Sequence, residues 1–126
     1  MDRNAFEKYV ADTYGVSGEH PWLRYPEFTV FRHAGNGKWF ALAMRIPKKF
    51  LGLNDEDEID VVNLKNHPAA VEFFVGTNGI FPAYHMNKTH WITVALDNSV
   101  PADLIKSLTE RSYDITAPKI KPNKLK

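Results

Sequence analysis

The residues best suited to chemistry in this chain gather in one segment, residues 82–94. It contains two histidines, His85 and His90, with Asn87 and Lys88 between them. An imidazole can act as a general base or a metal ligand, and lysine and asparagine side chains donate hydrogen bonds to phosphate oxygens. The segment is therefore a candidate for catalysis, for metal binding or for nucleic-acid binding.

The pattern around this segment predicts a β-hairpin. The residues after the turn alternate at the two-residue period of a half-buried strand, with Ile92, Val94 and Leu96 on one face and Trp91, Thr93 and Ala95 on the other. If residues 86–89 form a four-residue loop, His85 and His90 lie opposite one another on adjacent strands. Their Cβ atoms would then be roughly 4.5–5.5 Å apart.

A metal site built on His85 and His90 is one alternative, although two histidines make an incomplete site. Zinc usually takes at least three protein ligands, and no carboxylate lies close in the sequence. A hydrolase or transferase with His85 as general base and Tyr84 or Lys88 as its partner is another. No nucleophile or phosphate-loop motif supports it, so we expect no enzyme activity and no cofactor.

Length and composition predict one domain. A chain of 126 residues can bury a substantial core but cannot hold two independent ones. No apolar run approaches the roughly 20 residues of a membrane span, and no signal peptide precedes the first amphipathic segment. The chain has no cysteine, which excludes disulfides and thiolate metal ligands. We expect a cytoplasmic monomer.

The basic residues are unevenly distributed. Four of the 16 Lys and Arg lie in residues 118–126, which leaves 12 against 15 Asp and Glu in the rest of the chain, a formal charge of −3. A strongly basic DNA clamp is therefore excluded, and DNA binding would depend on local clusters.

The remaining elements follow from periodicity. Residues 6–14 form a helix ended by Gly15, and residues 16–26 form a loop in which Trp22 and Tyr25 are interpreted as packing anchors. Three strands are expected at residues 28–33, 38–46 and 59–64, the first two joined by the Asn36-Gly37 turn. In the second strand, alternation puts Phe40 on the core face with three other apolar residues, Leu42, Met44 and Ile46.

Two further helices are predicted, with caps taken from local sequence. Asn66 is the expected N-cap of a short helix that contains Pro68, and Ser99 is the expected N-cap of the last helix, entered through Pro101. Short connections favour antiparallel pairing, so the fold class is α+β, a two-layer sandwich with helices on an antiparallel sheet. The domain is expected to span residues 1–115, and residues 116–126 to form a mobile basic tail.

The two predicted hairpin tips share a pattern, since one carries Asn36 and Lys38 and the other carries Asn87 and Lys88. Turns favour asparagine for conformational reasons alone, and lysines at tips are commonly only solvated. The residues expected to contact DNA are Asn36, Lys38, Arg45, Lys48, Lys49, His85, Asn87, Lys88 and His90.

The alternative to DNA binding is a protein-interaction module that uses a face with Trp39 and Trp91, unless the third helix covers those side chains.

Several segments carry a resemblance to a known family. The sequence resembles the MmcQ/YjbR family of small bacterial proteins in Tyr-His-Met-Asn-Lys at 84–88 and His-Trp-Ile-Thr-Val at 90–94. Further matches stand in the family's order, at residues 21–22, 30–33, 37–42, 62–65 and 112–113. The resemblance implies a frataxin-like (CyaY-like) fold and a double-wing motif in which two hairpin tips contact the phosphates of duplex DNA.

Overall fold

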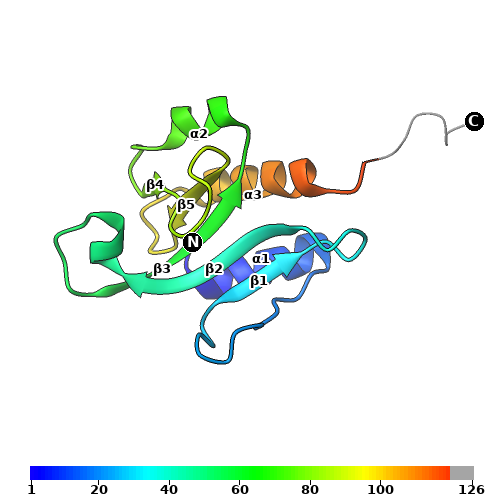
Figure 1. Cartoon of the computed structure of the whole chain (residues 1–126), viewed down its shortest axis with the longest axis horizontal. Coiled ribbons are helices and arrows are strands. Elements are labelled where there is room, and N and C mark those ends of the chain that lie inside the picture. Colours follow the sequence, from blue (N-terminus) through cyan, green and yellow to red (C-terminus); the bar gives the residue numbers. More distant parts are fainter. Residues whose placement is uncertain (120–126) are drawn as a thin grey trace, which may run out of the picture.

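The computed structural model describes residues 1–119 and contains three α-helices, one 3-10 helix and five strands. Figure 1 shows the strands as one twisted sheet with α1 and α3 on the same side of it. In chain order the elements are α1 (Arg3–Tyr14), β1 (Thr29–Arg32), β2 (Trp39–Pro47), η1 (Lys48–Leu51), β3 (Glu58–Lys65), α2 (Pro68–Phe74), β4 (Ile80–Pro82), β5 (Trp91–Ala95) and α3 (Ala102–Thr116).

The sheet has the strand order β1-β2-β3-β5-β4, and every neighbouring pair is antiparallel. All three helices pack on one face, where Phe6 and Val10 of α1 meet Ile105 and Leu108 of α3 in a single apolar core. Val71 of α2 joins the same core. The predicted α+β class with helices on an antiparallel sheet is confirmed.

The first helix begins and ends for local reasons. The carboxylate of Asp2 accepts a hydrogen bond from the Ala5 amide at 2.9 Å, and Gly15 takes a left-handed φ of 65° just after the last turn. Such a cap satisfies one of the free amides of a first turn, and a left-handed residue after the last turn suits glycine. The predicted end at Gly15 is confirmed.

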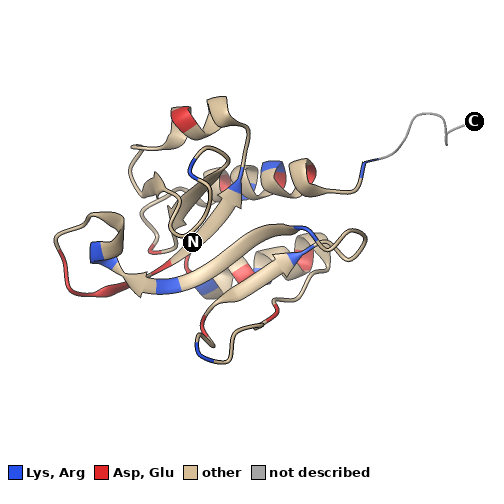
Figure 2. Cartoon of the chain, viewed as in Figure 1, with Lys and Arg blue, Asp and Glu red and all other residues tan. Residues whose placement is uncertain are grey.

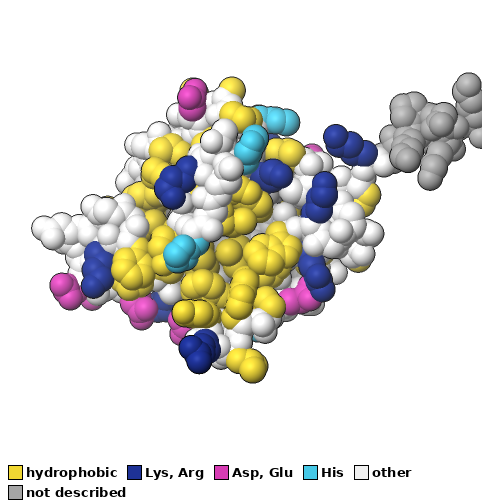
Figure 3. All heavy atoms as spheres, viewed as in Figure 1, with side chains coloured by type: hydrophobic (Ala, Val, Ile, Leu, Met, Phe, Trp, Pro, Cys, Tyr) yellow, Lys and Arg dark blue, Asp and Glu magenta, His cyan; other side chains and the backbone are white. Residues whose placement is uncertain are grey.

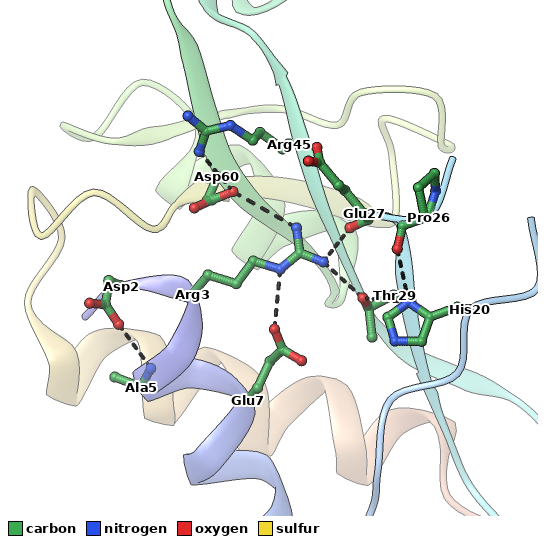
Figure 4. Close-up of polar contacts among 10 residues, drawn as sticks. All are labelled: Asp2, Arg3, Ala5, Glu7, His20, Pro26, Glu27, Thr29, Arg45 and Asp60. Carbon is green, nitrogen blue, oxygen red and sulfur yellow. Dashed lines mark hydrogen bonds and ion pairs between the residues drawn. The ribbon is translucent and has the colours of Figure 1, made fainter. Parts of the chain in front are cut away.

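A cluster of charges fastens α1 to the sheet (Figure 4). The guanidinium of Arg3 donates to the Glu7 carboxylate at 3.2 Å, to the Thr29 hydroxyl at 2.8 Å and to the Glu27 carbonyl. Asp60 of β3 lies between this guanidinium, at 3.8 Å, and that of Arg45, at 3.3 Å. Arg3, Glu7, Arg45 and Asp60 line a surface depression, and their charges pair with one another there.

The face assignment predicted for the second strand is wrong at its beginning. Phe31 pairs with Ala41 but Arg32 pairs with Trp39, so Phe40 is an extra residue in β2. This bulge turns Phe40 into the core beneath the helices and directs Trp39 to the opposite face. Simple two-residue alternation fails across such a bulge.

The expected N-caps of both later helices are also wrong. His67 occupies the N-cap position of α2, while Asn66 is buried and its side-chain oxygen accepts from the His67 amide at 2.9 Å. Pro101 stands at the N-cap of α3, and the Ser99 hydroxyl donates to the Asp97 carboxylate at 2.5 Å. In both places the side chain expected to cap the helix instead forms a hydrogen bond with a residue one or two positions away.

The C-terminal end of α3 reaches beyond the predicted limit of the domain at residue 115. The helix continues to Thr116, whose side chain is buried and donates to the Ser112 carbonyl at 2.7 Å. Most of the tail predicted to be mobile, residues 120–126, lies outside the described residues. Among residues 1–119, no helix is both long and apolar enough to cross a membrane.

Candidate binding face

The sheet face opposite the helices carries an apolar groove with a volume of about 460 Å³. Figure 3 shows this face as a hollowed area of hydrophobic side chains, with Lys, Arg and His side chains around its edge. We call it the aromatic groove. Its lining consists of Trp22, Tyr25, Phe28, Trp39, Leu42, Met44, Phe50, Tyr84, His85 and Met86.

Four separate segments build the aromatic groove, and none of them is a helix of the core. Its floor is the apolar side of β2, and its walls come from the loop before β1, from η1 and from the β4–β5 connection. The bulge in β2 is decisive because it places Trp39 on this side, where its ring meets Trp22 edge to face at 5.7 Å. A volume of this size falls within the roughly 300–1,000 Å³ of ligand sites.

Two aromatic rings of the aromatic groove remain open to solvent. Tyr25 keeps 56% of its surface exposed and Phe50 keeps 50%, although both belong to residue types that usually bury their rings. Phe50 lies almost parallel to Tyr84, with 5.6 Å between ring centroids and 15° between their planes. Tyr25 and Phe50 therefore leave aromatic surface open to a ligand beside the groove.

The position of Tyr84 is set by a buried polar pair on the sheet. The side chain of Asn63 donates to the Tyr84 carbonyl at 2.8 Å, and the Thr93 hydroxyl accepts from the Tyr84 amide at 2.9 Å. Thr93 in turn donates to Asn63 at 2.5 Å, and both side chains are fully buried. Partial burial raises the pKa of the Tyr84 phenol, and the nearby Tyr25 adds to that effect.

The loop between β1 and β2, residues 33–38, contains two predicted DNA contacts, Asn36 and Lys38, which differ in their contacts with the rest of the fold. The Asn36 amide donates to the Thr116 carbonyl of α3 at 2.9 Å, and its oxygen accepts from the Lys38 amide at 3.0 Å. Asn36 is thus engaged within the fold. Lys38 is exposed, forms no ion pair within residues 1–119, and precedes Trp39 of the aromatic groove.

The second loop, residues 83–90, contains four of the predicted contacts. Asn87 accepts from the amides of Thr89 and His90 at 2.8 and 3.2 Å, which shapes the turn. Lys88 and His90 are exposed, and His85 is exposed at the edge of the aromatic groove. The structure gives Lys88 no carboxylate partner among the residues that it describes.

The predicted cross-strand pairing of His85 with His90 is wrong. The β4–β5 ladder ends where Pro82 pairs with Ile92, so both histidines belong to the connecting loop. His85 adopts a left-handed φ of 59°, which removes it from any strand. Within residues 1–119, no group of three or more His, Cys, Asp or Glu side chains is arranged to hold a metal ion.

The third predicted basic cluster lies at the end of β2 and in η1. Arg45 lies near Glu58 and Asp60, at 3.7 and 3.3 Å, and Lys48 lies 3.3 Å from Asp55. Lys49 is exposed and precedes Phe50. Acidic residues gather in the connection between η1 and β3 and at the start of β3 (Figure 2), and Arg45 and Lys48 are each paired with one or more of them.

Sequence reasoning missed the groove because its walls come from distant segments. Trp22 and Tyr25 were interpreted as packing anchors, and nothing in a linear pattern joins them to Phe50 or Tyr84. The available signal was the density of aromatic residues outside regular helices. Trp91 is only 9% exposed and does not line the groove. The third helix covers the sheet face opposite the groove. Of the predicted tryptophan face, only Trp39 lines the groove.

Comparisons with known proteins agree with this architecture. The YjbR family model matches residues 11–115. The uncharacterized protein YyaQ of Bacillus subtilis is 37% identical over 116 residues, which cover 92% of this chain and 98% of the relative. A crystal structure of a Pseudomonas syringae protein has 44% identity and a TM-score of 0.91, covering 93% of this chain and all of that one.

A more distant crystal structure, that of the Deinococcus radiodurans protein DR2400, has 24% identity and a TM-score of 0.70, with 97% of this chain and 83% of the other covered. At that identity the likeness concerns the fold alone. The family model and the two nearer relatives span nearly the whole described chain. This protein therefore belongs to the YjbR family.

Proposed function

We propose that this protein binds DNA on the helix-free face of its sheet, with the loops 33–38 and 83–90 contacting phosphates on either side of the aromatic groove. The observation that carries the proposal is the placement of Lys38 and Lys88. Both are exposed cations without a carboxylate partner in the described chain, and both adjoin residues that line the groove. Phosphate contacts of this kind give affinity without sequence preference.

The proposal retains the double-wing motif implied by the family resemblance, with a smaller set of contacts. Lys38, Lys49 and Lys88 are the exposed basic residues that remain, and His85 and His90 lie beside them. Arg45, Lys48 and Asn36 serve the fold through their own contacts. Because residues 1–117 carry a formal charge of −3, a footprint of a few phosphates is expected, and binding should be strong only at low salt.

The test is fluorescence anisotropy with labelled 20-base-pair and 20-nucleotide DNA across a salt series. Lys38→Glu and Lys88→Glu should each weaken binding to unrelated sequences alike and reduce the slope of log K against log salt by roughly 0.9 per lost duplex contact. Arg111→Glu is the matched control, because Arg111 is exposed on α3 and that helix covers the opposite face.

The four lysines beyond residue 118 need their own control, since a lysine-rich segment can bind DNA through charge alone. A variant with Lys119, Lys121, Lys124 and Lys126 changed to glutamine should keep most of its affinity and its sensitivity to Lys38→Glu. Loss of all binding in that variant, or equal effects of Arg111→Glu and Lys88→Glu, would contradict the proposal.

A further inference from the structure

We infer that the aromatic groove holds an unpaired nucleobase, so that the DNA bound on this face is single-stranded or locally opened. This inference rests on the proposed function, which concerns only the phosphate contacts. It adds a second kind of contact, made by stacking on ring faces. Its basis is the combination of open aromatic surface with free cations at the edge of one groove.

The first step is the shape of the surface. Single-stranded nucleic acid is held by aromatic side chains whose ring faces stay available, because every base offers a flat apolar surface to stack on. Tyr25 and Phe50 have half or more of their surface exposed and stand on the wall of the groove. A paired base inside a duplex presents only its edge, so these ring faces have no use there.

The second step is charge. No Asp or Glu lines the aromatic groove, and His85 is its one titratable group apart from the two tyrosines. Lys88 lines an adjoining depression that shares Phe50, Tyr84 and His85 with the groove. Glu27 and Glu58 line another depression, which shares Tyr25, Phe28, Phe50 and Tyr84 with the groove, so carboxylates stand on that side of it. A ligand with a flat apolar part and an anionic part would therefore place the anion toward Lys88, as a nucleotide does.

The third step is the polar inventory of the groove. Base edges carry hydrogen-bond acceptors, and the phenol of Tyr84, which lines the groove, is a hydrogen-bond donor. Asn63 and Thr93 hold the backbone of Tyr84, and its ring is stacked on Phe50 beside the groove. A donor held in place beside stacking surfaces favours a base over an alkyl chain.

The experiment compares three 12-nucleotide probes by anisotropy at low salt: oligo(dT), a strand of the same length made of abasic sugar phosphates, and a fully paired duplex. The abasic strand retains the phosphates and removes the bases. Stacking is worth roughly 5- to 150-fold in affinity per base, so oligo(dT) should bind tighter than the abasic strand by about that factor. Tryptophan fluorescence should be quenched by oligo(dT) alone.

Tyr25→Ala and Phe50→Ala should each reduce the preference for oligo(dT) over the abasic strand, without changing affinity for the abasic strand. Both side chains are half exposed, so the variants are expected to fold, which thermal unfolding would check. Phe73→Ala is the matched control, because this ring is 76% exposed but belongs to α2, outside the groove. It should leave all three affinities unchanged.

Equal affinity for oligo(dT) and the abasic strand would overturn the inference while leaving the phosphate contacts of the proposed function intact. Absence of binding to every probe would overturn both. A dimer in sedimentation analysis that Phe50→Ala dissociates, together with no base-dependent binding, would assign the groove to a second copy of the chain.

Discussion

The loop between β1 and β2 is fastened to α3, whereas the loop between β4 and β5 is held mainly by the sheet beneath it, with one ring contact to η1. In the first loop, His33 and Asn36 form hydrogen bonds with the last turn of α3, at 2.9–3.0 Å. In the second, Asn63 and Thr93 hold the backbone of Tyr84, and Asn87 shapes the tip by itself. The shared Asn and Lys pattern of the two tips therefore conceals two different kinds of support.

This difference separates the roles of the two loops. The first loop ties the residues before Trp39 to the end of α3, because His33 and Asn36 form hydrogen bonds with Thr116. The second positions Tyr84 through a buried polar pair. The rest of this loop is held by Met86, which packs on the apolar side of the sheet, and by the His90 carbonyl, which accepts from the Asn66 amide at 2.8 Å. We expect the first loop to respond to changes in α3 and the second to respond to changes within the sheet.

The largest effect is expected from Asn63→Ala, which removes the support of the second loop. The substitution leaves the Tyr84 carbonyl and the Thr93 hydroxyl without their buried partner and opens a small cavity. The free energy of unfolding should fall by about 3 kcal/mol, measured by urea denaturation. Asn54→Ala, at an exposed position, is the control; a loss below about 1 kcal/mol for Asn63→Ala would contradict the assigned role.

His33→Ala should have the next largest effect, confined to the first loop. The imidazole Nε2 lies 3.0 Å from the Tyr113 carbonyl and 2.9 Å from the Thr116 hydroxyl, and the ring packs 4.2 Å from Tyr113. Losing these contacts should cost about 2 kcal/mol. Hydrogen exchange should quicken at residues 33–38 and in the last turn of α3, while residues 83–90 keep their protection. Equal loss in both loops would show that they are coupled.

The two tip asparagines offer a direct comparison. Asn36→Ala removes a bond to α3 and should cost about 1 kcal/mol, whereas Asn87→Ala removes bonds within its own turn and should cost somewhat less. Thermal unfolding of both variants, with Asn78→Ala as the exposed control, measures the difference. A larger loss for Asn87→Ala would reverse the comparison.

The smallest effect is expected from shortening the chain after Ala117. This truncation retains Thr116, so all three hydrogen bonds of the first loop with α3 survive, and the free energy of unfolding should change by less than about 0.5 kcal/mol. Truncation after Ile115 removes Thr116 and should cost at least about 1 kcal/mol. Equal stability of the two truncated chains would show that the Thr116 contacts contribute nothing measurable.

Much of the fold was predictable from local sequence. Phe6 and Val10 at helical spacing before Gly15 determined the first helix, and Asn36-Gly37 determined the turn between the first two strands. The alternation after Trp91 identified β5 as a strand. These features depend on residues within a few positions of one another, where periodicity and turn preference act directly.

The candidate binding face was decided by tertiary structure. A single extra residue in β2 moved Trp39 to the side of the aromatic groove, and the early end of the β4–β5 ladder separated His85 from His90. Neither event has a signal in a linear pattern, because bulges and ladder ends depend on how neighbouring strands twist and pair. The sequence by itself determined which elements form and that lysines stand at two tips. Only packing between distant segments brought Tyr25, Phe50 and Tyr84 together around one groove.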